Sequence, residues 1–279
     1  MEINNLLEKI IIKPNDSLEE SYNKAITFFE YNDIKVYRPD YLNENITGKD
    51  YTKIFNIYHD EVKYSCFVIN SLWDDDKINK ILNSFSQTSN KSKVYFLSAY
   101  PLPDILNFIS TNTEASFFEL EAIRNLKNIK NISYDRDLIF KYSDLLNNLS
   151  KKYFKLSIDD NVPESLKNIE KIIIHHFRNG EAYQALYETD IIYFPHYSLL
   201  LFGLYISNLL IKNFHGELFY QQSQEINELG IGFSTKKDDV IDIMAHPIDK
   251  IFKFFMNGKD SSVINWYYEL KYLFNNIKN

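Results

Sequence analysis

The chain has 279 residues, of which 45% are hydrophobic and 25% are charged. Such a composition is typical of a soluble globular protein, and it excludes intrinsic disorder and collagen-like repeats. The length suffices for one large domain or two of ordinary size, and 21 tyrosines and 21 phenylalanines supply apolar material for their cores.

The charge and the cysteine content exclude further classes of protein. There are 31 basic and 38 acidic side chains, and the formal net charge of −7 divides into −5 for residues 1–150 and −2 for residues 151–279. A DNA- or RNA-binding surface needs positive charge, so the bulk charge suits a basic protein partner better. The single cysteine, Cys66, excludes a disulfide framework within the chain. Because the first residues lack the basic region of a signal peptide, we expect a cytoplasmic protein.

The first half of the sequence predicts a mixed α/β domain over residues 1–150. Ser17 and Glu20 form a capping box at the start of a helix, whose apolar residues continue to Phe29. Two runs of β-forming residues flank His59-Asp60-Glu61 and predict a hairpin. The other elements expected here are strands at 34–37 and 93–98 and helices at 74–85, 103–109 and 133–149.

The second half, residues 151–279, predicts a helix-rich domain with a small antiparallel sheet, so that the whole chain belongs to the α+β class. Glycine and proline mark most of the element ends in this half. Helices are expected at 163–180, 182–187, 195–214, 247–257 and 263–277, and short strands at 217–221, 229–233 and 240–244.

The segment from Ile191 to Ile211 contains no charged residue and is long enough to cross a bilayer. It also contains Pro195, Ser207 and Asn208, and its ends have no strong basic bias. We therefore expect a buried core helix, and we regard a membrane-attached protein as the weaker interpretation.

The last quarter of the chain resembles a poorly characterised bacterial α+β domain. The resemblance rests on GLYISNLLIKNFHGEL (Gly203–Leu218) and HPIDKIFKFFMNG (His246–Gly258). The chain departs from that pattern at Ser207-Asn208, where the pattern has Gly-Glu, and at Leu218, where it has Trp. Such domains occur in cytosolic proteins, some of them near toxin–immunity loci, and the resemblance transfers no site. The matching residues are Gly203, Tyr205, Gly216, Glu217, Pro247 and Gly258.

One pattern resembles the PD-(D/E)xK signature of metal-dependent nucleases. Pro39-Asp40 is followed by Glu61-Val62-Lys63, and Glu20 could add a third carboxylate around Mg²⁺. In such a site, Asp40 and Glu61 would bind the metal, and Lys63 would position the attacking water. The D/E-x-K triplet occurs four times in the chain, however, and Glu61 falls at the expected hairpin turn.

The other ionisable residues have structural explanations. Asp74-Asp75-Asp76 fits the start of a helix, where negative charge is favourable, and His175 and His176 point about 100° apart on a helix. Cys66 is expected to be buried in a strand. The leading hypothesis is therefore a non-catalytic protein-binding module without cofactor, such as an immunity protein that blocks a basic toxin. The alternative is the metal-dependent nuclease.

Overall fold

A computed structural model describes most of the chain. Residue contacts divide the chain into two units, Met1–Arg124 and Asn125–Asn279. The domain boundary expected at residue 150 would fall inside helix α6 (Arg136–Phe154). The described residues are 3–38, 52–70, 77–78, 80–82, 92–126, 136–159, 162–178, 197–215, 217–219, 230–234 and 241–277.

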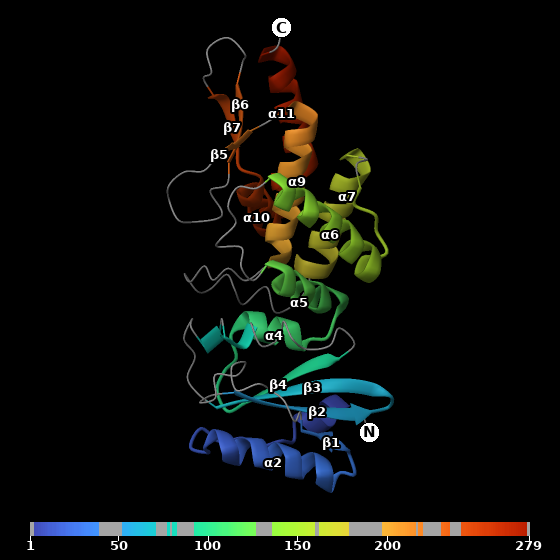
Figure 1. Ribbon diagram of the computed structural model, residues 1–279, viewed down its shortest axis with the longest axis vertical. Helices are drawn as coiled ribbons and strands as arrows, with labels where there is room; N and C mark the ends of the chain where they lie inside the picture. The colour runs from blue at the N-terminus through green and yellow to red at the C-terminus, as the bar shows by residue number, and fades with distance from the viewer. Residues whose placement is uncertain are drawn as a thin grey trace. The chain divides into compact units, whose positions relative to one another are not determined.

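Unit 1 is built on a mixed sheet of four strands in the order β1-β2-β3-β4. The strands β1 (Val36–Tyr37), β2 (Thr52–His59) and β3 (Val62–Ile69) run antiparallel, and β4 (Lys93–Ser98) is parallel to β3. The predicted hairpin and the predicted 93–98 strand are thus confirmed. In Figure 1 this sheet lies between α2 (Leu18–Tyr31) and α4 (Asp104–Ser110).

One face of this sheet packs against α2 and carries the main core of unit 1. The capping box begins the helix as predicted, with Ser17 N donating to Glu20 Oε2 at 2.7 Å and Glu20 N donating to Ser17 Oγ at 3.2 Å. The α2 side chains Ala25, Ile26 and Phe29 are buried against the sheet. Helix α1 (Ile3–Leu7) adds Ile3 and Leu6 to the same core. The sheet residues of this face include Phe55, Ile57, Tyr64, Cys66 and Val68.

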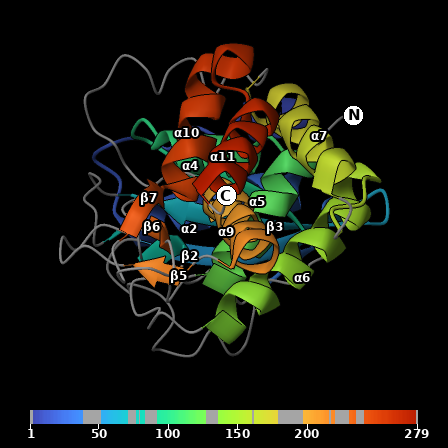
Figure 2. The same ribbon diagram turned by 90° about the horizontal axis from the view of Figure 1, so that it is seen from above.

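Unit 2 is built around α9 (Tyr197–Phe214), in which 15 of 18 residues are buried. It packs against α6 and against α10 (Pro247–Asn257), and Figure 2 shows α9 nearly end-on between them. The other helices of this unit that the structure describes are α7 (Val162–Ile172), the π-helix η2 (Ile173–Arg178), the 3₁₀-helix η5 (Gly258–Ser261) and α11 (Val263–Ile277). Helix α5 (Glu114–Leu126) spans the boundary between the two units.

Helix α9 contains the described part, residues 197–211, of the segment that could cross a bilayer by its length and composition. Among the described residues, it is the one helix long and apolar enough to cross a bilayer, and 83% of that stretch is buried inside the protein. The described part of the segment is therefore the buried core helix that the sequence predicts.

A carboxylate from α7 fixes the start of α11. Glu170 Oε1 accepts hydrogen bonds from Ser262 Oγ at 2.8 Å, Val263 N at 2.6 Å and Ile264 N at 3.1 Å. Backbone N–H groups at a helix start have no partner within the helix, so this carboxylate satisfies two of them and complements the helix dipole. Val263, Tyr267, Leu270 and Phe274 on the inner side of α11 are buried.

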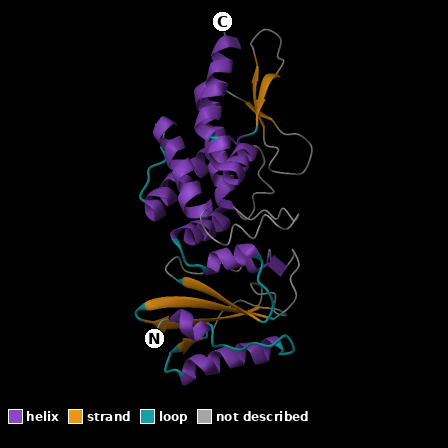
Figure 3. Ribbon diagram, turned by 180° about the vertical axis from the view of Figure 1, so that it is seen from behind, coloured by secondary structure: helices purple, strands orange, loops and turns teal. Residues whose placement is uncertain are grey.

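Three short antiparallel strands form the second sheet, in the order β5-β6-β7. They are β5 (Glu217–Phe219), β6 (Gly230–Ser234) and β7 (Ile241–Ala245), close to the three strands expected from the sequence. Figure 3 shows them beside the helices of unit 2. One unit with a mixed sheet and one helix-rich unit with a small antiparallel sheet confirm the predicted α+β class.

Candidate functional site

The residues of the nuclease hypothesis lie on separate elements where the structure describes them. Glu20 closes the capping box of α2, and the hydrogen bond from Ser17 N lowers the pKa of its carboxyl group. Glu61 lies in the turn between β2 and β3. Lys63 is paired with Tyr58 on the sheet face opposite α2, because successive strand residues point to alternate faces. Asp40 lies outside the described residues, so the complete metal set stays a prediction.

The structure shows the surroundings of Cys66, His175 and His176. Cys66 is fully buried, and this burial raises the pKa of its thiol well above the usual value. His175 is exposed, whereas the ring of His176 lies 4.5 Å from the ring of Phe154. Within the part of the chain that the structure describes, no three His, Cys, Asp or Glu side chains lie close enough to hold a metal ion. His196 and Asp74-Asp75-Asp76 lie outside that part.

The turn between β2 and β3 has an unusual backbone for its residue types. Asp60 has φ 49° and Glu61 has φ 63°, and the turn is closed by the pair His59 and Val62. Two positive φ angles in a two-residue hairpin define a type I′ turn, for which Asn-Gly is the favoured sequence. Glu is among the residues that this conformation strains, because its Cβ approaches the backbone. The turn thus holds two exposed carboxylates, and its conformation disfavours one of the two residues, Glu61.

A tyrosine pair lies beside this turn, on the sheet face opposite α2. The rings of Tyr37 and Tyr58 are 4.9 Å apart at an interplanar angle of 74°, and the side chains are 39% and 46% exposed. The Lys35 ammonium lies 4.8 Å from the centre of the Tyr37 ring. Edge-to-face contact holds both rings in place while they remain accessible. We call Tyr37, Tyr58, Asp60 and Glu61 the hairpin surface.

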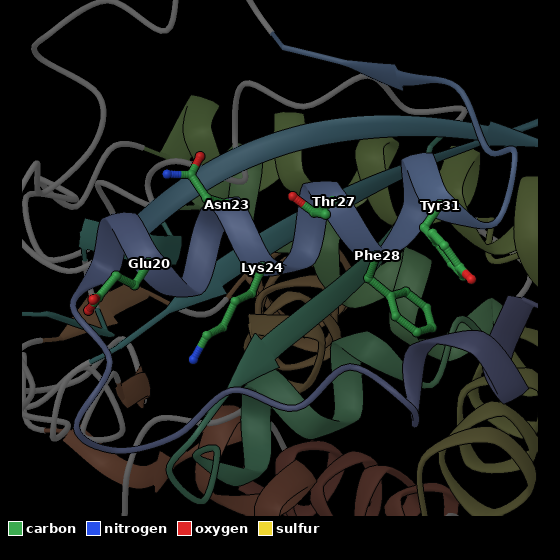
Figure 4. Close-up of a pocket in the computed structure, with 6 residues that line it drawn as sticks. All are labelled: Glu20, Asn23, Lys24, Thr27, Phe28 and Tyr31. Carbon is green, nitrogen blue, oxygen red and sulfur yellow. The ribbon is translucent and has the colours of Figure 1, made fainter.

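The outer side of α2 carries a shallow groove of about 570 Å³. In Figure 4 the side chains of Lys24, Phe28 and Tyr31 project from the same side of the helix. Lys24 is paired with the Asp16 carboxylate, and that hydrogen bond lowers the pKa of Asp16. Tyr31 is 87% exposed at the end of the helix. The groove therefore offers an apolar surface beside an ion pair, and the Glu20 carboxylate also lines it.

The sequence predicts a metal-binding role for Glu61, which stays a prediction, but it does not indicate the tyrosine pair beside this residue. The pair forms because β1 joins β2 with Tyr37 opposite Asn56, which places Tyr37 diagonally from Tyr58. That register depends on a two-residue strand, and no periodic signal in the sequence reveals it. The abundance of tyrosine was the available signal.

No family model, curated protein or solved structure matches the chain in comparisons with known proteins. The resemblance of residues 203–258 to a bacterial domain is therefore neither supported nor opposed by a relative, and it remains a prediction.

Proposed function

We propose that the chain is a non-catalytic protein-binding module that contacts its partner through the hairpin surface. Eight large hydrophobic side chains are exposed among the described residues, and five of them are tyrosines. Tyrosine is enriched at binding hot spots, because it supplies a large contact area and a hydrogen bond at low entropic cost. The observation that carries the proposal is the ordered and accessible pair of Tyr37 and Tyr58 next to an acidic turn.

The charge distribution supports a basic partner. Unit 1 has 13 basic and 19 acidic side chains, a net charge of −6, whereas unit 2 has 18 and 19, a net charge of −1. The acidic excess therefore belongs almost entirely to the unit that carries the hairpin surface. Such a field attracts a positive protein and disfavours nucleic acid.

The biological role that we propose is that of a bacterial immunity protein, which neutralises a toxin by covering it. This assignment rests on the resemblance of residues 203–258 and on the acidic unit 1, which would suit a basic toxin. An immunity protein needs only tight and specific binding, so it requires neither a cofactor nor a metal ion.

The test is binding of the full chain to the purified product of the neighbouring gene, measured by isothermal titration calorimetry. We expect a tight complex, and we expect Tyr58→Ala to weaken it by about tenfold or more. Tyr272→Ala is the matched control, because Tyr272 is 68% exposed on α11 in the other unit, and it should leave the affinity unchanged. Absence of a complex with a folded neighbouring product would contradict the proposed function. Equal effects of the two variants would contradict the location of the interface.

A further inference from the structure

Lys250 in α10 carries a charge that its surroundings compensate poorly. The side chain is partly buried, and its Nζ atom lies 6.0 Å from the centre of the Trp266 ring of α11, at the outer limit of a cation–π contact. Within the described ranges, this ammonium group takes part in no hydrogen bond and no ion pair. A charge that is partly removed from water and has no partner is unfavourable. Compared with a lysine in water, this position therefore favours the neutral amine.

The neighbouring carboxylates have other partners or are open to water. Four charged groups of the described chain act on Lys250, and they belong to α7, α10 and α11. Asp249 Oδ2 is paired with Lys253 Nζ at 2.7 Å. Glu170 accepts the three hydrogen bonds at the start of α11, and Glu269 is exposed. Lys250 is thus left without a direct counter-charge, and the ammonium group of Lys253 adds a like charge.

These surroundings lower the pKa of the Lys250 ammonium group. Burial is the main cause, Lys253 acts in the same direction, and the carboxylates, led by Glu269, oppose it only in part. The neutral amine is the nucleophilic form of lysine, and reactive lysines are activated by the same two means, loss of water and a neighbouring cation. Because a less basic group is also a weaker nucleophile, the gain in rate is smaller than the gain in neutral amine.

We propose that Lys250 is a site of covalent acylation, which accepts an activated acyl group from an acyl phosphate or a thioester. The neutral amine attacks the acyl carbon and forms an N–C bond, while the C–O bond to phosphate or the C–S bond to the thiol breaks. The leaving group keeps the electron pair of that bond, and the nitrogen loses one proton to water. The product is an uncharged amide beside Trp266, so the partly buried charge and its repulsion from Lys253 both disappear.

Lys253 provides a matched control on the same helix. It lies three residues after Lys250, but its side chain is 63% exposed and its ammonium group is paired with Asp249. Acylation of Lys253 would break this ion pair, whereas acylation of Lys250 breaks none. Both lysines belong to unit 2, so the inference does not depend on the hairpin surface of unit 1.

Acetylation of the full chain, followed at each lysine by mass spectrometry of proteolytic peptides, tests the site. The probes are acetyl phosphate and the thioester S-acetyl-N-acetylcysteamine, each used over a range of pH. With both, we expect Lys250 to react several-fold faster than Lys253, and its rate should level off at a lower pH. The reagent that gives the larger ratio of the two rates identifies the preferred class of acyl donor. Equal rates at the two lysines in the folded chain would overturn the proposal.

Unfolding the chain in urea provides a reference for this comparison. The two lysines should then react at the same rate, because the expected difference comes from the folded surroundings of Lys250. A preference for Lys250 that persists in urea would assign the selectivity to the local sequence and would refute the proposed cause.

Two variants change the charges around Lys250 and leave the residue itself in place. Lys253→Gln removes the like charge and frees the Asp249 carboxylate, so acetylation of Lys250 should slow several-fold. Glu269→Gln removes a carboxylate that favours the ammonium form, so acetylation should become faster. Both residues are exposed, and the melting temperature should stay close to that of the parent. Accessibility alone does not produce opposite effects of this kind, and a rate that neither variant changes would refute the activation of Lys250.

Discussion

At the residue scale, Asp60 and Glu61 show how local backbone preference and surface chemistry oppose each other. Both residues occupy the left-handed region, which Asn and Gly tolerate and Glu does not. Asp60 is exposed, and its Oδ2 atom lies 3.4 Å from His59 Nε2. A turn selected only for folding would favour Asn or Asp at position 60 and Gly at position 61. The carboxylate of Glu61 is therefore better explained by the surface that it creates than by the turn in which it lies.

Replacing the turn by its favoured sequence separates these two roles. Asp60→Asn with Glu61→Gly should stabilise the hairpin by about 1–2 kcal/mol, because strain at the positive φ angle of Glu61 is relieved. Thermal unfolding followed by circular dichroism, together with amide hydrogen exchange in β2 and β3, measures this gain. The same variant should bind the partner of the hairpin surface more weakly, since both charges are lost. A variant that is less stable than the parent would show that the carboxylates support the fold itself.

Individual site residues were the least predictable part of the molecule. The sequence shows the D/E-x-K triplet at Glu61 but not the positive φ of this residue, and the backbone conformation determines which role it can take. It shows Ser207-Asn208 as an interruption in an apolar helix, yet it does not show that Asn208 faces Ser143 from a segment 65 residues away. Such pairings depend on helix packing, which single-sequence patterns do not encode.

At the element scale, strong local signals predicted the structure well. The capping box of α2, the hairpin and the 93–98 strand all appear, because each is specified by neighbouring residues. Helix α5 was not predicted. Its buried side includes Glu119 and Glu121 next to Phe118 and Ala122, so the charges obscure the apolar periodicity. The π-helical turn after α7 was also missed, since it continues the same apolar pattern with a changed hydrogen-bond register.

Gly203 determines how closely α9 and α10 can approach each other. A Cβ atom at this position would lie 2.8 Å from the Cα atom of Ile248 and 2.7 Å from its Cγ1 atom. Because backbone is among the atoms met, the two helices would have to move apart. We expect Gly203→Ala to destabilise unit 2 by about 1–3 kcal/mol, although alanine is the better helix former.

Urea unfolding of the full chain, followed by tryptophan fluorescence, to which Trp266 in α11 contributes, measures this change. Ser207→Ala, one turn further along α9, is the control and should shift the midpoint much less, because its hydroxyl bonds only within its own helix. A Gly203→Ala variant as stable as the parent would mean that α10 can shift at no cost.

At the scale of the whole molecule, the composition predicted a globular protein and its net charge. It did not predict how that charge is divided between the two units. Counted by halves at residue 150, the acidic excess appears spread, at −5 and −2. Counted by the two units, it lies almost wholly in unit 1, at −6 against −1. The difference arises because residues 125–150, which include most of α6, belong to the helix-rich unit. The position of the boundary between the two units therefore determines which surface is expected to attract a basic partner.

The uneven division of charge between the two units predicts how salt affects association with a basic partner. Long-range attraction acts mainly on the association rate and is screened over about 10 Å at 0.1 M salt. Raising sodium chloride from 50 to 500 mM should therefore slow association on the order of tenfold, with a smaller effect on dissociation. Stopped-flow or surface plasmon resonance with the full chain measures both rates.

Two charge-matched variants distinguish general steering from docking. Glu19→Gln with Glu114→Gln removes two exposed carboxylates of unit 1 that lie in the first turns of α2 and α5, outside the hairpin surface. Because steering depends on total charge, this pair should slow association as much as Asp60→Asn with Glu61→Gly does. Only the hairpin variant should also speed dissociation, since its carboxylates would contact the bound partner. An association rate that does not depend on salt would remove the electrostatic basis for a basic partner.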